Sequence, residues 1–571
     1  MVQNIDEVTF MNKSAIYHRS QDNWCFPVGN EALELRIRTG LDVVRATCEF
    51  GDQHEGERIG MQWTWKSQKI EMKLSGVTAL HKFWKCIVSP PHRRMKYHFI
   101  LSALLETIVY GETSILDPME ILDNFNYFFF PYLHREEVYH APKWVADTLW
   151  YQIFPDRFAK QENETGFKEW HAGPVRNADH YGGNLKGITS KLTYLNALGI
   201  TGIYLTPIFA SPTVHKYDTE DYFKIDPDFG TEEDLVELVK AAHQLGIKVM
   251  LDAVFNHAGA KFEKWLDVRK SQKSPYRDWF YLGENDQYET FSFEKNMPKL
   301  NTEHPDVIDY FCKVGIYWIE KADIDGWRLD VADEISHTFW RSFRKCVHNV
   351  NPEVYILGEV WHDAMPWLQG DQFDAVMNYP YTRILLDLIA HQRISLKDFR
   401  FGIDEIFNHY PSVIQANQFN LFDSHDTMRL TTICGNDLSK VKGALAFLYA
   451  SPGSPCIYYG TEIALEGGND PDCRRLMQWQ PEPDTNDMYR FIKTWILLRK
   501  EHPALANHGS WEWINAECIA FRRCNAQECL CFFYNPSDMP LPFDFPKGKI
   551  LFGERSDVLN PGEILLIKQD V

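Results

Sequence analysis

An arginine and an aspartate lie two positions apart in the apolar stretch "DGWRLDVADE", which runs from Asp325 to Glu334. Side chains alternate between the two faces of a β-strand, so Arg328 and Asp330 point the same way while Leu329 points the other way. Such a pair is either a structural ion pair at the end of a strand or a catalytic carboxylate that an arginine keeps ionised. The choice between these interpretations depends on what the rest of the chain places near Asp330.

Three further apolar runs also end in polar residues that can do chemistry. The run "IKVMLDAVFNH" ends at His257, "VYILGEV" holds Glu359 near its end, and "FNLFDSHD" ends with His425 and Asp426. In a parallel barrel the carboxyl ends of neighbouring strands meet at one mouth, which is the catalytic face of such enzymes. Carboxylates, imidazoles and a guanidinium would converge there, and this convergence favours the catalytic interpretation.

The elements that must position these residues alternate between strands and helices from Trp144 onward. In "TEEDLVELVKAAHQLGIKVMLDAVF", Thr231 is expected to cap a helix together with Asp234, and Gly246 is expected to end that helix before a buried strand. Eight strand candidates follow one another in this manner, which predicts a (β/α)₈ TIM barrel. An insertion over residues 258–302 follows the third strand.

The regions on either side of the barrel have a β pattern. Residues 1–130 alternate apolar and polar side chains, as in "ALELRIRTG", and predict an N-terminal β-sandwich. Residues 505–571 return to short strands and predict a C-terminal β-domain. The barrel with its insertion then occupies residues 131–504, and the predicted fold is multidomain.

Asp330 and Glu359 are separated by one strand–helix–strand unit, so they are expected at the ends of adjacent strands. Adjacent strands lie about 4.8 Å apart, which suits the roughly 5–5.5 Å between the carboxyl groups of a retaining glycosidase. We expect Arg328 to lower the pKa of Asp330 and keep that carboxylate nucleophilic. We expect Glu359, near other carboxylates and apolar walls, to hold its proton longer, as a general acid must.

The same motifs resemble those of a known family. "DAVFNH", "GWRLDVADE", "GEVW" and "FDSHD" resemble, in order, the four signature regions of the α-amylase family, glycoside hydrolase family 13. "MPKLN", Met297 to Asn301, resembles an extra signature of its neopullulanase, cyclomaltodextrinase and maltogenic amylase group. "DVADE" departs from the usual D-V-A-N-E of that group, with Asp333 where asparagine is common, a change expected to tune the acceptor subsites. The resemblance covers nearly the whole chain, because the group also carries an N-terminal starch-binding-like module.

The resemblance implies a role for each member of the catalytic set. Asp330 would be the nucleophile and Glu359 the acid/base. Asp426 would bind sugar hydroxyls and favour the distorted transition state. Arg328 would orient Asp330.

The resemblance also implies substrate-binding residues. His257 and His425 would hydrogen-bond the sugar at the cleavage point, and Tyr217, in "HKYDTEDYFKIDPDFG", would stack on that sugar. Asp470 and Arg474, in "GGNDPDCRR", would close the donor end. Without its motif, Tyr217 would be interpreted as a core residue.

Three other residues near the motifs have alternative interpretations. Trp361, beside the acid, is expected to form an aromatic wall on the acceptor side, and the alternative is simple packing. Asp252 and Asn256 are expected to be architectural, shaping the loop after the third strand.

The places where relatives often bind calcium differ in this chain. An Asn-Gly-Asp run is replaced by "FAKQENETG", with Lys160 at an expected ligand position, and a Gly-Gly-Asp by "YGGNLKG", with Asn184 instead of the acid. Carboxylate charge sets calcium affinity, so we predict no metal at this position and no cofactor. A calcium site elsewhere is left open.

Composition narrows the partners and the compartment. A net charge of −20 without a long basic run argues against nucleic acid or an anionic membrane as the main partner. The chain has no apolar run of about 18 residues, and its first residues lack a secretion signal. The 12 cysteines are scattered without a C-x-x-C pair, so free buried thiols and a cytoplasmic location are expected.

These observations predict an α-glucan hydrolase that cleaves α-1,4 bonds of cyclomaltodextrins and maltooligosaccharides, with pullulan as a further candidate substrate. A transglycosylating or α-1,6-active relative is the near alternative. A non-catalytic glucan-binding protein on the same fold is the alternative of another class. The resembling group also implies a homodimer in which the N-terminal module narrows the active-site cleft of the partner.

Overall fold

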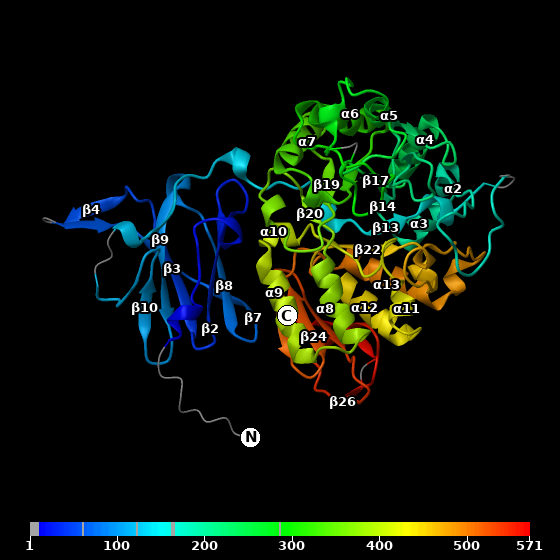
Figure 1. Ribbon diagram of the computed structural model, residues 1–571. Coiled ribbons are helices and arrows are strands. Elements are labelled where there is room, and N and C mark those ends of the chain that lie inside the picture. The colour runs from blue at the N-terminus through cyan, green and yellow to red at the C-terminus, as the bar shows by residue number, and fades with distance from the viewer. Residues whose placement is uncertain are drawn as a thin grey trace. The chain divides into compact units, whose positions relative to one another are not determined.

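The computed structural model describes residues 11–59, 62–120, 124–161, 166–284, 287–554 and 556–570. The chain forms two compact units (Figure 1). Unit 1 consists of Met1–His140 together with Lys397–Gln415, and unit 2 of Ala141–Leu396 together with Ala416–Val571. Each unit is described by itself below.

Unit 1 contains a sandwich of two antiparallel sheets. The first sheet has the order β1-β2-β8-β7, with bounds Cys25–Pro27, Leu33–Gly40, His81–Val88 and Lys73–Val77. The second has the order β11-β10-β9-β3-β6, with β12 also paired to β9; the bounds are Ile115–Leu116, Thr107–Tyr110, Met95–Ser102, Arg45–Gly51, Gln68–Glu71 and Phe128–Phe130. Apolar side chains of both sheets, such as Leu35, Ile37, Cys48 and Phe99, are fully buried between them. The prediction of an N-terminal β-sandwich is therefore confirmed.

Helices from later in the chain complete unit 1. The helix α9 (Leu396–His409) and the short α10 (Ser412–Gln415) cover the outer face of β2, where the sequence pattern would have left polar residues in water. The buried Glu34 and Arg36 form an ion pair at 2.5 Å, and the Ser412 hydroxyl donates to Glu34. A strand that alternates apolar and polar residues is thus buried on both faces.

Unit 2 contains eight parallel strands in the order β20-β19-β18-β17-β14-β13-β22-β21. A parallel bridge between Met377 and Phe419 joins the two ends of this sheet and closes the barrel. In chain order the strands are β13 (Trp150–Ile153), β14 (Gly202–Leu205), β17 (Lys248–Ala253), β18 (Gly326–Leu329), β19 (Tyr355–Gly358), β20 (Ala375–Val376), β21 (Phe419–Asn420) and β22 (Ser454–Tyr458). The predicted TIM barrel is confirmed.

Helices surround the barrel (Figure 1). The main ones are α2 (Leu185–Ser190), α3 (Leu192–Leu198), α4 (Glu232–Gln244), α6 (Pro305–Ala322), α7 (His337–Val350), α8 (Tyr379–Ile389), α12 (Leu438–Ala450) and α13 (Asp487–Glu501). The predicted start of α4 is present, because Thr231 and Asp234 form a reciprocal capping box. Large side chains such as Trp150, Tyr204, Met250 and Phe419 fill the barrel interior.

Two further segments belong to unit 2, an insertion after β17 and a C-terminal β-sheet. After β17 the insertion holds α5 (Glu263–Lys270) and returns to the barrel through antiparallel bridges, one of which joins His257 to Lys299. At the C-terminus a five-stranded sheet has the order β23-β24-β25-β29-β27, with bounds Glu512–Asn515, Ile519–Cys524, Cys529–Tyr534, Ile564–Gln569 and Gly548–Phe552. The predicted insertion and C-terminal strands are both present.

The expectation that every cysteine is free is wrong for one pair. Cys524 and Cys529 face each other across the β24–β25 hairpin and form a disulfide. The close pairing at a hairpin end is a tertiary feature that their spacing in the sequence does not indicate. The other ten cysteines are free, and only Cys346 among them is partly exposed.

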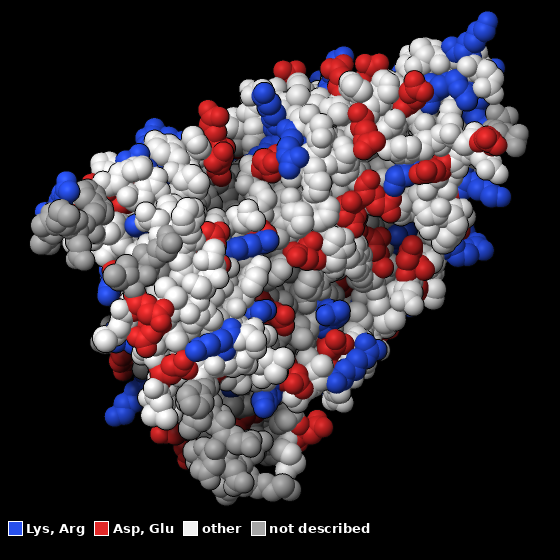
Figure 2. Space-filling model, turned by 60° about the vertical axis from the view of Figure 1, so that its left-hand side comes forward, with Lys and Arg blue, Asp and Glu red and all other residues white. Residues whose placement is uncertain are grey.

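The surface shows no single dominant charge on the face drawn in Figure 2. There, lysine and arginine side chains are interspersed with aspartate and glutamate. Within the described residues, no helix is long and apolar enough to cross a membrane.

Candidate active site

The carboxyl ends of the central barrel strands bring the predicted residues together. Parallel pairing aligns Asp252 on β17 with Arg328 on β18, and Leu329 on β18 with Gly358 on β19. Asp330 and Glu359 directly follow the second pair, so they lie at the ends of adjacent strands. A pocket of about 600 Å³ opens over them. It is lined by Asn177, His215, Tyr217, His257, Phe291, Glu294, Met297, Asp330, Val331, Asp333, Glu359, Trp361, Asp426, Asp470 and Arg474.

Arg328 lies at the centre of the carboxylates below the pocket. Its Nη1 donates to both oxygens of Asp252 at 3.1 and 3.0 Å and to Oδ1 of Asp330 at 2.9 Å. Its Nη2 lies 2.9 Å from Oε2 of Glu359. The guanidinium is fully buried. Arg328 therefore contacts three carboxylates, where the alternation of the sequence indicated one.

Burial dominates the electrostatics of these carboxylates. It raises the pKa of Asp330 well above its ordinary value, while Arg328 lowers that pKa and Glu359 raises it again. The expectation of a lowered pKa at Asp330 is thus wrong for the net direction, although the arginine acts in the expected sense. Burial also raises the pKa of Asp252. Burial thus outweighs the single cation at both aspartates, and each holds a proton more readily than an exposed aspartate does.

The two oxygens of Glu359 have different surroundings. Oε2 accepts the backbone N–H of Val331 at 3.1 Å and faces Arg328. Oε1 accepts the indole N–H of Trp361 at 3.1 Å. The Trp361 ring stacks on Tyr379, with centroids 3.5 Å apart, and is 50% exposed. Trp361 therefore packs on Tyr379 and at the same time lines the pocket beside Glu359, and its role as an acceptor-side wall stays a prediction.

A hydrogen-bonded chain joins the other predicted residues of the floor. The side-chain amide of Gln152 lies 2.7 Å from Nδ1 of His425, whose Nε2 lies 3.1 Å from Oδ2 of Asp426. The Tyr217 hydroxyl donates to Asp252 at 3.1 Å, and its ring lies parallel to that of His425. Burial lowers the pKa of His425 well below its ordinary value, so the imidazole is neutral. Burial, and then Glu359, raise the pKa of Asp426 to about 7.

Arg474 lines the pocket near Asp426 and contacts several other residues of that wall. Its Nε donates to the carbonyl oxygen of His425 at 2.9 Å, and its Nη1 lies 2.9 Å from Asp470. The same Nη1 donates to Oδ1 of Asn177 at 3.2 Å. This wall thus combines the two predicted donor-end residues with an asparagine from the loop after β13.

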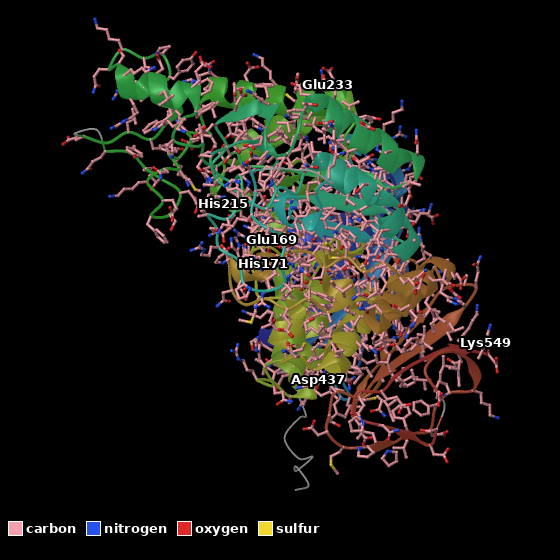
Figure 3. The ribbon with its side chains drawn as sticks, turned by 90° about the vertical axis from the view of Figure 1, so that its right-hand side faces the viewer. Glu169, His171, His215, Glu233, Asp437 and Lys549 are labelled. Atoms are coloured by element: carbon pink, nitrogen blue, oxygen red, sulfur yellow. A yellow bond between two sulfur atoms is a disulfide. The ribbon has the colours of Figure 1, made fainter. Side chains whose placement is uncertain are left out.

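Histidines from two loops line the pocket above the floor. The His215 ring accepts the backbone N–H of Tyr217 at 3.1 Å. His257 contacts the carbonyl oxygen of Tyr217 at 3.1 Å and stacks on Phe291, with ring centroids 4.7 Å apart. Burial lowers the pKa of His257 to about 3, so the imidazole is neutral near pH 7. In Figure 3 the loop that carries His215 lies on the side of the barrel from which the insertion extends.

Asp333, the departure from the group motif, has a partner in the structure. Its Oδ2 lies 3.0 Å from Nε2 of His362, the residue that follows Trp361. Asp333 also lines the pocket. The carboxylate therefore ties the turn after β18 to the loop that carries the aromatic wall, a contact that an asparagine could make only as a neutral hydrogen bond.

Several residues of the site were missed by the sequence interpretation. Asp252 was expected to be architectural only, yet it shares Arg328 with Asp330. Gln152 could have been found as the single polar residue in "LWYQIF", a run otherwise buried in the barrel. Tyr379 and Phe291 carry no local signal, since aromatic residues in apolar segments are usually core.

The two segments considered for calcium have other roles where they are described. The Asn184 side chain caps α2 by accepting the backbone N–H of Gly187 at 2.8 Å. The Lys160 ammonium lies over the ring of Trp170. Residues 162–165 of "FAKQENETG" lie outside the described residues. The absence of a metal at this position stays a prediction.

Comparisons with known proteins found matches that cover nearly the whole chain. Residues 152–507 match the family model "Alpha amylase, catalytic domain", and residues 11–134 match "Alpha amylase, N-terminal ig-like domain". A cyclomaltodextrinase of Geobacillus thermopakistaniensis (strain MAS1) is 45% identical over 95% of this chain and 96% of that protein. An intracellular maltogenic amylase of Bacillus subtilis is 42% identical over 93% of this chain and 92% of that protein. A solved cyclomaltodextrinase structure matches with a TM-score of 0.88 and 39% identity, covering 98% of both chains.

Proposed function

The chain belongs to the α-amylase family of glycoside hydrolases, and from this premise we propose that it cleaves α-1,4 bonds of cyclomaltodextrins and maltooligosaccharides with retention. One observation carries the proposal: Asp330 and Glu359 end adjacent strands, share Arg328 and open into one pocket. The complete nucleophile and acid pair argues against the alternative of a non-catalytic glucan-binding protein.

The proposed mechanism gives each carboxylate one role, and the contacts of Arg328 support it. Arg328 holds Oδ1 of Asp330, which leaves Oδ2 to attack the anomeric carbon. Glu359 gives its proton to the glycosidic oxygen as that bond breaks, and the free glucan end leaves. Water then attacks the glycosyl–Asp330 ester, Glu359 takes the proton of that water, and Asp330 is released as the carboxylate. Asp426 and the neutral His257 line the pocket and are available to sugar hydroxyls, whereas His425 lies buried beneath them and contacts Asp426.

The substrate proposal rests on the pocket walls and on the relatives. Aromatic rings of Tyr217, Phe291 and Trp361 line the pocket and offer faces for glucose rings. The relatives are named for cyclomaltodextrin and maltose chemistry. Initial rates on cyclodextrin, maltotriose, pullulan and starch test the proposal. Activity on none of them would overturn it, and α-1,6 cleavage or transfer products as the main outcome would favour the alternative.

We expect the first product to be the α-anomer. Asp330 and Glu359 contact the same guanidinium at the ends of adjacent strands, and strands about 4.8 Å apart suit the roughly 5–5.5 Å of a retaining pair, which leaves no room for a water between the carboxyl groups. Proton NMR during the first minutes of maltotriose hydrolysis distinguishes the two outcomes, before mutarotation mixes the anomers. An initial excess of β-maltose would contradict the double displacement.

We propose that the enzyme needs neither calcium nor another cofactor. The Asn184 side chain is used as a helix cap, and the positions compared with calcium ligands carry an amide and a lysine in place of carboxylates. Treatment with EDTA is therefore expected to leave the melting temperature and the cyclodextrin rate unchanged. A fall of several degrees that added calcium restores, and magnesium does not, would show a calcium site elsewhere.

We propose a cytoplasmic homodimer in which a second copy narrows the cleft. Ten free cysteines and a relative named intracellular support the location. Leu104 and Leu105, at the tip of the β9–β10 hairpin of unit 1, are 82% and 77% exposed, which suits burial against another chain.

Dilution tests this assembly with the full chain. We expect light scattering to give a dimer at micromolar concentration, and we expect the ratio of cyclodextrin to starch rates to fall as dilution releases monomer. Leu104→Asp should move both the dissociation of the dimer and the fall in the rate ratio to higher protein concentration. Leu80 is another exposed leucine, and Leu80→Asp serves as the matched control. A monomer at every concentration, or a constant ratio, would contradict the proposal.

A further inference from the structure

Val331, the residue after Asp330, has a backbone conformation that its type rarely adopts. Its φ of 45° and ψ of 46° lie in the left-handed region. Glycine and asparagine enter this region readily, whereas a β-branched residue there is a genuine outlier. Strained backbone of this kind persists where the surrounding structure imposes it and clusters at functional sites.

The left-handed turn changes where the backbone N–H groups point. In an extended parallel strand, successive N–H groups alternate between the two neighbouring strands. The Asp330 N–H still bonds to Ala253 at the end of β17, at 3.0 Å. The next two N–H groups both turn toward the residue after β19: Val331 donates to Oε2 of Glu359 at 3.1 Å, and Ala332 donates to its carbonyl oxygen at 3.2 Å. The turn is thereby hydrogen-bonded twice to Glu359, once to its carboxylate and once to its backbone carbonyl.

The contacts of this turn and of Arg328 make the two side-chain oxygens of Glu359 unequal. Oε2 accepts the Val331 N–H and forms an ion pair with Arg328, whose Nη2 lies 2.9 Å away. A proton on Oε2 would point at these N–H groups, because a protonated carboxyl oxygen becomes a donor. Oε1 meets only the Trp361 N–H in the described structure and belongs to the carboxyl group that lines the pocket.

We propose that Val331 is a positioning residue that holds Oε2 of Glu359 as an acceptor and so places the catalytic proton on Oε1. The inference rests on the proposed function, in which Glu359 is the acid. In the first step the Oε1–H bond breaks and its proton goes to the glycosidic oxygen, which departs with the electron pair of the broken C–O bond. In the second step Oε1 takes the proton of the attacking water.

The side chain of Val331 also matters, because it limits the backbone conformations of the turn that positions the N–H. A β-branched side chain excludes more of φ/ψ space than glycine does, so Val331 narrows the range of conformations that this turn can sample. Glycine at position 331 would keep the N–H but could leave the left-handed region freely. The Val331→Gly variant is therefore expected to loosen the contact with Oε2 while every ionisable side chain of the pocket stays in place, although it removes the valine side chain that lines the pocket.

The experiment compares two substrates that differ in their need for an acid. Maltotriose has a poor leaving group that must be protonated, whereas 2,4-dinitrophenyl α-maltoside has one that leaves without a proton. We expect Val331→Gly to lower kcat/KM on maltotriose roughly 10-fold, a part of what general acid catalysis supplies, and to change it less than about 2-fold on the dinitrophenyl glycoside. For Val331→Ala, which keeps the Cβ, kcat/KM on maltotriose should lie between the values of wild type and Val331→Gly.

Thermal stability provides a second measurement, which should not fall when the activity on maltotriose falls. Since glycine removes the strain of the turn, we expect the melting temperature of Val331→Gly to equal or exceed that of wild type. If that variant does not fold, Val331→Asn, which tolerates the left-handed region, is tested by the same two-substrate ratio. Equal losses on both substrates, or no loss on maltotriose, would overturn the inference. A wild-type enzyme inactive on both substrates would instead overturn the proposed function.

Discussion

Asp330→Asn and Glu359→Gln are each expected to lower kcat/KM on maltotriose by about 10⁴-fold or more while the protein stays folded. The two carboxylates act as one unit, since the ester cannot form without Asp330 and the leaving oxygen is not protonated without Glu359. Folding should not suffer, because burial already disfavours the ionised form of Asp330, and an amide keeps its shape without the charge.

The two variants should differ on the dinitrophenyl glycoside. Glu359→Gln should retain much of the first, acid-independent step and release product faster when azide replaces the water that Glu359 can no longer activate. Asp330→Asn should stay inactive on both substrates. Circular dichroism and melting temperature serve as folding controls. A folded variant that keeps a tenth of the wild-type rate on maltotriose would remove its residue from the proposed role.

The parts of the site that the sequence predicted share a physical basis. A period of two placed Arg328 and Asp330 on one side of a strand, and parallel topology required the ends of neighbouring strands to meet. Asp330, Glu359, His425 and Asp426 could be expected together for this reason. The barrel itself follows from strand-like apolar runs separated by capped helices.

Other features depend on contacts that no local pattern encodes. The shared use of Arg328 by Asp252 requires the register of β17 against β18, which only the folded barrel fixes. The left-handed turn at Val331 contradicts the preference of its own residue type. Helices α9 and α10 belong to unit 1, although nothing in their sequence distinguishes them from barrel helices. Tertiary packing overrides local preference in each of these cases.

Arg328→Met is expected to abolish activity and also to destabilise unit 2 by about 3–5 kcal/mol at neutral pH. The variant leaves Asp252, Asp330 and Glu359 buried together without their cation. Arg328→Lys should recover only part of either loss, because a single ammonium cannot reach three carboxylates with the planar fork of the guanidinium.

The pH dependence of this penalty identifies its cause. Burial raises the pKa of Asp252 and Asp330 even with the arginine present, and removing the arginine raises both further. A carboxyl group whose pKa is raised on folding contributes stability below its unfolded pKa and loses it as pH rises through the folded pKa. The difference in unfolding free energy between wild type and Arg328→Met should therefore be small near pH 4 and grow steadily toward about pH 8.

A second substitution separates charge from packing. Adding Asp252→Asn to Arg328→Met removes one uncompensated carboxylate without changing the volume of the site, so the double variant should regain stability at pH 8 but no activity. Urea unfolding of wild type, both single variants and the double variant at several pH values forms a double-mutant cycle. The cycle gives the free energy of interaction between Arg328 and Asp252 at each pH. If Arg328→Met loses the same stability at every pH, or if Asp252→Asn restores nothing, the guanidinium stabilises the barrel by filling space. In that case neutralisation of the three carboxylates would not be the reason why the Arg328 guanidinium is buried beneath the pocket.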